Sequence, residues 1–358
     1  MSNPAALARA DIRSLQPYQH AAWKPTLERL HANEMPWRAQ GDASALGLNR
    51  YPEPQPPELI RRLADLYDVQ PDQVIAGRGS DEGIDLLVRV FCRAEHDSVV
   101  ICPPTFGMYK VCAKIQGAGL IEIPLLKEEG FALDTEKLLS TWQPGVKLYF
   151  LCSPNNPTGN TVDVAAIERL CRELDDKALI VVDEAYIEFS QQGSLTRLLA
   201  KHANLAILRT LSKAYALAGA RCGAVIAHPD VISLMARVIP PYALPVTTVQ
   251  AVMQFTSSEQ QVLSKQRIAV ILEERVKLAE RLQALRAIRR VWPSDTNYLL
   301  VECADAEQVL QSAQNVGLII RDQRSQPMLA NCVRITVGTP EQNERLVRGI
   351  ASSMRATA

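Results

Sequence analysis

The chain has 358 residues, of which 47% are hydrophobic, and this length and composition allow a large core and about two domains. Its 39 basic and 39 acidic side chains cancel, which argues against a nucleic-acid-binding protein, and its five histidines show no metal-ligand spacing, so we expect no metal site. The eight cysteines form no C-x-x-C pair, and we find neither a signal-peptide pattern nor an apolar stretch near the ~20 residues of a membrane-spanning helix, so we expect a reduced, cytoplasmic protein without a membrane partner.

The first strongly periodic segment predicts an amphipathic helix over residues 57–68, with Pro57 in its first turn. Short apolar runs then alternate with helical patterns as far as residue 240. The runs are almost continuously hydrophobic, which is typical of strands buried on both faces. This alternation predicts an α/β fold in which a mostly parallel, seven-stranded sheet lies between helices. The predicted strands are Val74–Ala76, Ser98–Cys102, Leu120–Ile123, Val146–Cys152, Leu179–Asp183, Leu205–Arg209 and Gly223–Ala227, and the predicted helices include Ser80–Cys92, Met108–Gln116 and Asp163–Leu174.

The pattern changes at residues 240–246, where prolines precede long helical patterns that extend to about residue 288. Further strands are predicted at Tyr298–Val301, Leu318–Ile320 and Val333–Val337, with helices between them. These elements predict a second, smaller α+β domain. We expect the large domain to span residues 41–244. The periodicity of residues 1–40 is weak, and this segment could wrap either domain. We assign it to the small domain together with residues 245–358.

Two of the predicted strands lead into reactive side chains. Asp183 ends the strand Leu179–Asp183, and Lys213 lies in the loop after the next strand. In an open α/β sheet, ligands bind at the carboxyl ends of the strands. A buried carboxylate there needs a cationic partner, which could be a protonated pyridine nitrogen, an arginine or a helix amino terminus. Because a lysine amine can form an imine with an aldehyde, the pair predicts a pyridoxal 5'-phosphate site.

Two further residues could contact the 3′ oxygen of such a cofactor. Tyr186 lies three residues after Asp183, although a tyrosine there could equally be a packing residue. Asn156 lies in the turn Ser153–Gly159, which follows the strand Val146–Cys152 and could otherwise be an ordinary turn before a helix.

Two groups of residues are candidates for binding a cofactor phosphate. Ser80 and Asp81 begin a predicted helix directly after a glycine-containing turn, and free amide groups at a helix start attract phosphate, although a simply capped helix is the alternative. Thr210 and Ser212 precede the lysine and supply hydroxyl groups. Arg221 lies eight residues after the lysine. Its guanidinium could form bidentate hydrogen bonds with a phosphate, or it could be a surface side chain that faces solvent.

Three other residues have both a functional and a structural interpretation. Tyr109 follows the strand Ser98–Cys102 and could stack on a pyridine ring, or it could be a core aromatic. Arg334 interrupts an apolar strand, and Arg321 directly follows an apolar run. The two arginines could bind the acidic end of a substrate, or they could lie at strand edges and face solvent.

Taken together, these motifs resemble the fold-type-I aminotransferases, and among them the histidinol-phosphate aminotransferase family. The resemblance extends from about Tyr18 to about Gly338. It rests above all on Ser-Pro-Asn-Asn-Pro-Thr-Gly at 153–159, Asp-Glu-Ala-Tyr-Ile-Glu-Phe at 183–189, Arg-Thr-Leu-Ser-Lys-Ala-Tyr at 209–215 and Arg-Ile-Thr-Val-Gly at 334–338.

The resemblance implies roles around pyridoxal phosphate. Lys213 would attach the cofactor and move protons, Asp183 would pair with the ring nitrogen, and Tyr109 would stack on the ring. Tyr186 and Asn156 would contact the 3′ oxygen. The residues that would hold the cofactor phosphate are Ser80, Asp81, Thr210, Ser212 and Arg221.

The resemblance also implies a homodimer with shared active sites, because Tyr51 would reach the cofactor and the substrate from the neighbouring subunit. Arg321 and Arg334, with Tyr18, would bind the substrate's phosphate. The implied reaction is transamination between L-histidinol phosphate and 2-oxoglutarate, which gives imidazole acetol phosphate and glutamate in histidine biosynthesis. The alternatives are an aromatic amino-acid aminotransferase, a phosphothreonine-type decarboxylase, and a ligand-sensing module without catalysis.

Overall fold

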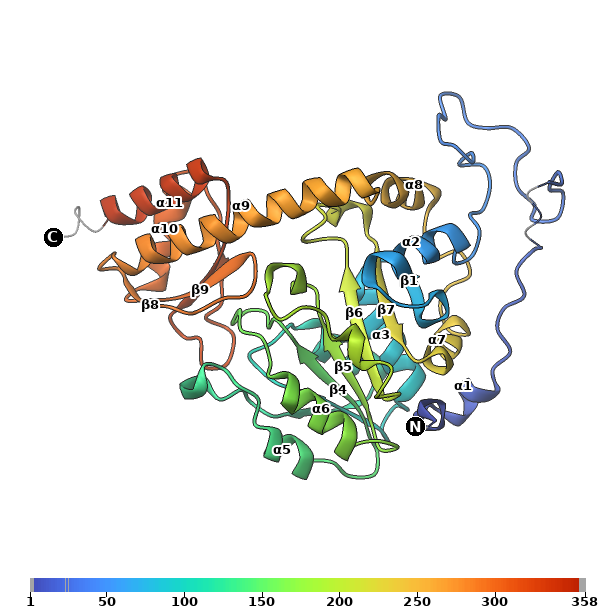
Figure 1. Ribbon diagram of the computed structural model, residues 1–358, viewed down its shortest axis with the longest axis horizontal. Coiled ribbons are helices and arrows are strands. Elements are labelled where there is room, and N and C mark those ends of the chain that lie inside the picture. The colour runs from blue at the N-terminus through green and yellow to red at the C-terminus, as the bar shows by residue number, and fades with distance from the viewer. Residues whose placement is uncertain (1–2, 23, 25, 354–358) are drawn as a thin grey trace.

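The structure is a computed structural model that describes residues 3–22, 24 and 26–353. Its larger sheet has seven strands in the order β1-β7-β6-β5-β4-β2-β3 (Figure 1). The five strands from β6 to β3 pair in parallel, whereas β7 runs antiparallel to both of its neighbours. The predicted mostly parallel, seven-stranded sheet is confirmed. The strands are β1 (Val74–Gly77), β2 (Ser98–Ile101), β3 (Gly119–Glu122), β4 (Val146–Cys152), β5 (Leu179–Asp183), β6 (Leu205–Thr210) and β7 (Gly223–Ala227).

Helices cover both faces of this sheet, and each face has its own apolar core. Successive side chains of a strand point to opposite faces, so in β4 Tyr149 and Leu151 enter one core while Leu148 and Phe150 enter the other. The core on the Tyr149 side is closed by α2 (Pro57–Tyr67), α5 (Thr135–Ser140) and α6 (Val164–Glu173). The core on the Phe150 side is closed by α3 (Ser80–Phe91), α4 (Met108–Gln116) and α7 (Pro229–Ala236).

The helices begin where the sequence supplies a capping group. Asp163 accepts a hydrogen bond from the Ala165 amide at the start of α6, and Asp134 accepts one from the Lys137 amide at the start of α5. Pro57 occupies the first turn of α2, as predicted. Across the described residues, none of the helices combines the length and apolar character needed to cross a bilayer.

The smaller sheet has four antiparallel strands in the order β10-β11-β9-β8. One face packs against three helices, and the long helix α9 runs from the side of the large sheet to this region (Figure 1). The elements are α8 (Val246–Phe255), α9 (Ser258–Gln283), β8 (Ile288–Val291), β9 (Tyr298–Cys303), α10 (Ala306–Asn315), β10 (Arg321–Asp322), β11 (Cys332–Thr336) and α11 (Pro340–Ser353).

In this region one predicted strand is wrong and one observed strand was missed. The strand predicted at Leu318–Ile320 is wrong, because pairing with β11 begins only at Arg321, which lies opposite Arg334. Leu318 and Ile320 instead pack beside the small core, and apolar character alone could not separate these two arrangements. The strand β8 was not predicted, because two exposed arginines, Arg289 and Arg290, interrupt its apolar pattern.

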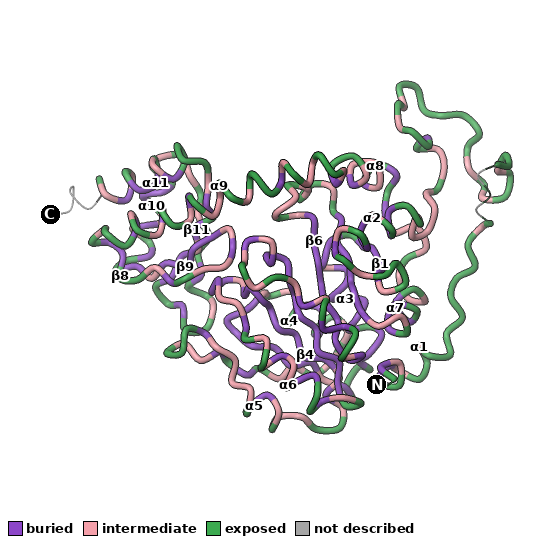
Figure 2. The backbone as a smooth tube through the Cα atoms, viewed as in Figure 1, coloured by how far each residue is buried: buried purple, intermediate pink, exposed green. Residues whose placement is uncertain are grey.

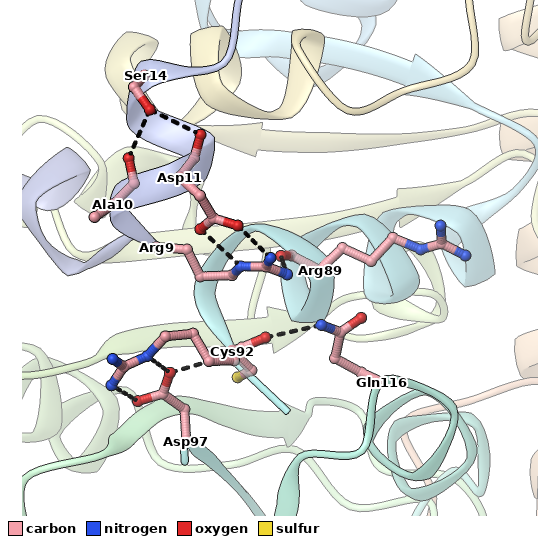
Figure 3. A network of polar contacts seen from close by, with 9 residues as sticks. Arg9, Ala10, Asp11, Ser14, Arg89, Cys92, Asp97 and Gln116 are labelled. Carbon is pink, nitrogen blue, oxygen red and sulfur yellow. Dashed lines mark hydrogen bonds and ion pairs between the residues drawn. The ribbon is translucent and has the colours of Figure 1, made fainter. Parts of the chain in front are cut away.

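The start of the chain lies with the large domain, which differs from its predicted assignment to the small domain. Leu7 and Ala8 belong to the core that contains α3 and α7. Arg9 donates two hydrogen bonds to the Asp11 carboxylate and one, at 3.1 Å, to the carbonyl oxygen of Arg89 (Figure 3). A weakly periodic segment of this kind carries no pattern that indicates its partner.

Residues 15–51, which we call the arm, extend from α1 (Ala10–Ser14) past the edge of the molecule and return to α2 (Figure 1). Figure 2 shows the described part of the arm as an almost continuous exposed tube. Several of its large apolar side chains are solvent-exposed, which is unusual for so many neighbours in sequence. They include Tyr18, Leu27, Leu30, Met35, Trp37, Leu46, Leu48 and Tyr51.

Candidate active site

A cavity of about 620 Å³ opens between the carboxyl edge of the large sheet and the small sheet. It lies where the sequence predicted it, because the parallel strands β4, β5 and β6 all end at this edge. Eleven of the predicted site residues line it, namely Ser80, Asp81, Asn156, Asp183, Tyr186, Thr210, Ser212, Lys213, Arg221, Arg321 and Arg334.

Asp183 is the buried acid of the cavity. Its carboxylate accepts hydrogen bonds from the Tyr109 hydroxyl at 2.8 Å and from the Ala185 amide at 3.1 Å. Burial raises the pKa of Asp183 to about 6, although the Tyr109 hydrogen bond and the Lys213 charge act in the opposite direction. No ion pair links Asp183 to a basic side chain among the described residues. The acid therefore fits a cationic group inside the cavity, such as the protonated nitrogen of a pyridine ring.

Lys213 lies three residues beyond β6, with its amine 5.6 Å from the centre of the Tyr186 ring. Burial lowers the pKa of the Lys213 ammonium, and the positive charges of Arg334 and Arg221 lower it further. Asp81 and Asp183 oppose this shift only in part. A neutral amine is a nucleophile, so this environment favours attack on a carbonyl group.

The groups predicted to bind phosphate converge at the start of α3. Ser80 begins this helix after Gly79, whose φ of +82° is in the left-handed region. Arg221 donates hydrogen bonds to the Ser212 hydroxyl at 3.4 Å and to the Asp81 carboxylate at 3.3 Å. The Thr210 hydroxyl lies 3.0 Å from that of Ser212. Amide groups, hydroxyls and a guanidinium around one point suit a phosphate dianion.

The two predicted arginines come from adjacent strands of the small sheet. Arg321 of β10 lies directly opposite Arg334 of β11, so their side chains share one face of the sheet. The Arg334 guanidinium lies 4.9 Å from the centre of the Tyr298 ring and donates a hydrogen bond to the Asn156 side chain. Its buried Nε has no hydrogen-bond partner in the described part of the chain. Two positive charges on one face of the sheet, both lining the cavity, favour an anion between them.

The turn that carries Asn156 is fixed by its neighbour Asn155. The Asn155 side chain binds Thr105, Thr158 and the Pro104 carbonyl oxygen. Its own carbonyl oxygen accepts a hydrogen bond from the Tyr298 hydroxyl at 2.7 Å, which ties the turn to the small sheet. The amide of Asn156 is therefore held at the junction of the two sheets.

Comparison with known proteins agrees with this geometry. Residues 22–350 match the family described as aminotransferase class I and II. The chain belongs to this aminotransferase family. It is 43% identical to the histidinol-phosphate aminotransferase of Stenotrophomonas maltophilia strain R551-3 over 357 residues, which cover 99% of this chain and 98% of the relative.

Two further comparisons extend the match. The chain is 45% identical over 345 residues to the histidinol-phosphate aminotransferase of Xylella fastidiosa strain Temecula1, which covers 95% of this chain and 94% of the relative. These identities confirm the predicted membership in the histidinol-phosphate aminotransferase family. The fold resembles the crystal structure of the Sinorhizobium meliloti enzyme of that name in complex with pyridoxal-5'-phosphate, with a TM-score of 0.77, 24% identity, and coverage of 86% of this chain and 84% of that chain.

One aromatic residue that was predicted to contact the cofactor ring does not line the aminotransferase cavity. Tyr109 was expected to stack on a cofactor ring, and this is wrong, because its side chain is fully buried and does not line the cavity. Its ring lies face to face with Phe150 at 4.9 Å, since the first turn of α4 points it into the core of the large domain. Phe106, three residues earlier, lines the cavity and meets Tyr109 edge-on.

Tyr18 and Tyr51 lie on the arm and do not line the cavity of their own chain. The Tyr51 ring stacks on Tyr242 with centres 4.5 Å apart, and His20 lies between Tyr242 and Tyr18 at 5.5 Å from each. Tyr242, which comes from the segment before α8, was not singled out in the sequence. Its proximity to Tyr51 depends on contacts between distant segments, so no local pattern could reveal it.

Three polar side chains that line the cavity were also missed. Gln323 and Gln326 follow β10, and Thr105 precedes Phe106. Amide and hydroxyl side chains are common in turns, so their type alone gave no signal. The only available indication was the position of Gln323 two residues after Arg321.

Proposed function

We propose that this chain catalyses the transfer of an amino group between L-histidinol phosphate and 2-oxoglutarate, with pyridoxal 5'-phosphate as cofactor, in the cytoplasm. The observation that carries the proposal is one cavity whose walls combine Lys213, Asp183 and the paired arginines Arg321 and Arg334. The identity of 43% to a histidinol-phosphate aminotransferase along 99% of the chain supports the same activity.

Bound pyridoxal phosphate supplies an aldehyde and an electron-accepting ring. Asp183 would hold a proton on the ring nitrogen, because a buried carboxylate stabilises a cation beside it. Tyr186 and Asn156 line the cavity from the turns after β5 and β4, where they would contact the 3′ oxygen. The start of α3 and Arg221 would hold the cofactor phosphate.

Lys213 is the residue that moves protons. Its lowered pKa leaves a larger neutral fraction than an ordinary lysine has. With the cofactor bound, the neutral amine would be the base that accepts a proton from the substrate carbon that bears nitrogen, and the resulting ammonium would be the acid that returns it. The same amine would hold the cofactor covalently between turnovers.

The arginine pair selects the substrate. L-Histidinol phosphate has a phosphate and no α-carboxylate, and a dianion suits two guanidinium groups better than a single negative charge does. Arg321 and Arg334 bind this phosphate, assisted by Tyr18. For an aromatic amino acid, Arg334 would hold a carboxylate instead.

The active unit is a homodimer with shared sites. Tyr51 is 49% exposed and outside the cavity of its own chain, so it is available to a second copy. The exposed apolar side chains of the arm need a partner surface of similar character. Both observations support exchange of the arms across the interface, with Tyr18 and Tyr51 reaching the neighbouring cavity.

A screen of half-reactions tests the proposed substrate. The purified yellow protein is mixed with single amines in the absence of an oxo acid, and its visible absorbance is followed. L-Histidinol phosphate should bleach the absorbance at lower concentration than phenylalanine does, and phosphothreonine should release no carbon dioxide. Stronger bleaching by phenylalanine would favour the aromatic aminotransferase, and carbon dioxide release from phosphothreonine would favour the decarboxylase.

A further inference from the structure

The arm contains one carboxylate that is almost completely buried. The Glu34 side chain is only 3% exposed, although the residues around it in sequence face solvent. It forms ion pairs with Arg29 at 3.0 Å and with Arg50 at 2.9 Å. It also accepts a hydrogen bond from the Tyr51 amide at 2.7 Å. The Glu34 carboxylate thus connects Arg29 with Arg50 and Tyr51 and closes residues 29–51 of the arm into a loop.

The same cluster also binds the backbone carbonyl oxygen of Tyr51. The Arg29 guanidinium donates hydrogen bonds to the Tyr51 carbonyl oxygen at 3.3 Å, and Arg50 donates one to the Arg29 carbonyl oxygen at 3.4 Å. Both polar groups of the Tyr51 backbone therefore have partners inside the cluster. The ring remains outside the cluster and stacks on Tyr242. Without the carboxylate, the two guanidinium groups would repel each other, and the Tyr51 amide would lose its acceptor.

We infer that Glu34 is a positioning residue, which fixes the backbone of Tyr51 so that its side chain enters the cavity of a second copy of this chain. The inference rests on the proposed function, in which Tyr51 serves the neighbouring site. Fixing the loop before the chains associate reduces the conformational entropy lost when Tyr51 reaches the neighbouring site. Glu34 itself contacts neither cofactor nor substrate.

The first test compares Glu34→Gln with Glu28→Gln. Glu28 lies in the same arm, is exposed, and forms no ion pair with the described residues, so it is a matched control for the loss of one charge. In Glu34→Gln, the KM for L-histidinol phosphate should rise about tenfold, as expected for one lost charge-assisted hydrogen bond. The pH titration of the cofactor absorbance should stay unchanged, because Lys213 and Asp183 are intact. Glu34→Asp keeps the charge and should recover part of the lost affinity. An unchanged KM in Glu34→Gln would overturn the inference.

The second test asks in which subunit Glu34 acts. Hybrid dimers are purified with one Lys213→Ala subunit and one Glu34→Gln subunit, each carrying a different affinity tag. The only site with a lysine then receives Tyr51 from the subunit with an intact Glu34. The hybrid should therefore show the wild-type KM, whereas the Glu34→Gln homodimer should not. A hybrid that retains the raised KM would overturn the inference, because Glu34 would then act on its own site.

A third comparison separates this inference from the proposal of shared sites. Tyr51→Ala should raise the KM, and adding Glu34→Gln to it should change the KM no further, because the side chain that Glu34 positions is gone. If Tyr51→Ala has no effect, the proposed role of Tyr51 fails, and the inference fails with it. If Tyr51→Ala has its effect and the two changes multiply, only the role of Glu34 is overturned.

Discussion

At the scale of single residues, Asp183 shows how burial serves function at the expense of stability. Its pKa lies at about 6 instead of the ordinary 3.8, so without cofactor the folded chain binds this proton more tightly than the unfolded chain does. The stabilising contribution is complete below about pH 4 and is lost as the pH rises through about 6. Above that range, the apoprotein holds a buried charge without a cation.

We therefore expect Asp183→Asn to stabilise the apoprotein while weakening catalysis. Relative to wild type, the free energy of unfolding should increase by up to about 3 kcal/mol at about pH 8 and by much less near pH 4. Urea denaturation of the two cofactor-free proteins at both pH values measures this difference. The exposed Asp65→Asn should show no such dependence, and a gap that is constant with pH would contradict the explanation.

Tyr109 acts on the same carboxylate through its hydroxyl. Its hydrogen bond lowers the pKa of Asp183, so Tyr109→Phe should raise that pKa further. Since the reaction needs the ionised carboxylate, the acidic limb of the pH profile of kcat/KM should move to higher pH. Tyr149→Phe removes another buried hydroxyl, which binds the Leu138 carbonyl oxygen on the opposite face of the sheet, and it should leave the limb in place. Coincident profiles for the two variants would refute the role of Tyr109.

At the scale of elements, the phosphate site depends on close contact between α3 and β7. A Cβ atom at Gly223 would lie 2.5 Å from the Ser80 amide nitrogen and 2.8 Å from the Arg209 carbonyl oxygen. Both are backbone atoms that cannot rotate away. This contact brings the start of α3 against the first residue of β7, next to Arg221.

Gly223→Ala should therefore push the start of α3 away from the cavity. We expect a loss of stability of roughly 1–3 kcal/mol, the usual cost of overpacking, together with weaker retention of the cofactor. Thermal unfolding and equilibrium dialysis measure the two effects. Gly219→Ala is the control, since a Cβ atom there meets nothing within 4 Å. Equal behaviour of the two variants would show that the contact is dispensable.

The elements that the sequence predicted best are those with an uninterrupted apolar pattern. All seven strands of the large sheet were located to within one residue, and the side chains that follow β4, β5 and β6 were placed correctly at one edge. Prediction failed where the sequence pattern fits more than one structure. Phe106 and Tyr109 are both aromatic, and only the direction of α4 decides which of them faces the cavity. The short strand β10 has two residues, which is too few for any periodicity.

At the scale of the whole molecule, contacts between distant segments were beyond the reach of local patterns. The Glu34 cluster connects residues up to 22 positions apart in sequence. The Tyr51 ring stacks on Tyr242, which lies much further along the chain. Such contacts depend on how the arm returns to the large domain. The division into residues 41–244 and the two flanking segments stays a prediction, apart from the start of the chain.

Shared active sites predict that two defective subunits can complement each other. Lys213→Ala should abolish turnover, and Tyr51→Ala should impair it. In a hybrid of the two, one site has its lysine and receives Tyr51 from the other subunit, so about half of the wild-type activity per dimer should return. Steady-state assays of doubly tagged hybrids measure this recovery. A hybrid no better than the Tyr51→Ala homodimer would exclude exchange of Tyr51.

The burial of all eight cysteines offers a practical route to the arm. Burial raises the pKa of Cys92, Cys102 and Cys222 to about 12, so at neutral pH these thiols hold their protons and react poorly with maleimides. A cysteine introduced in place of Leu30, which is 93% exposed, would then be the preferred labelling position. A fluorophore attached there would report directly on whether the arm of one copy meets the surface of another.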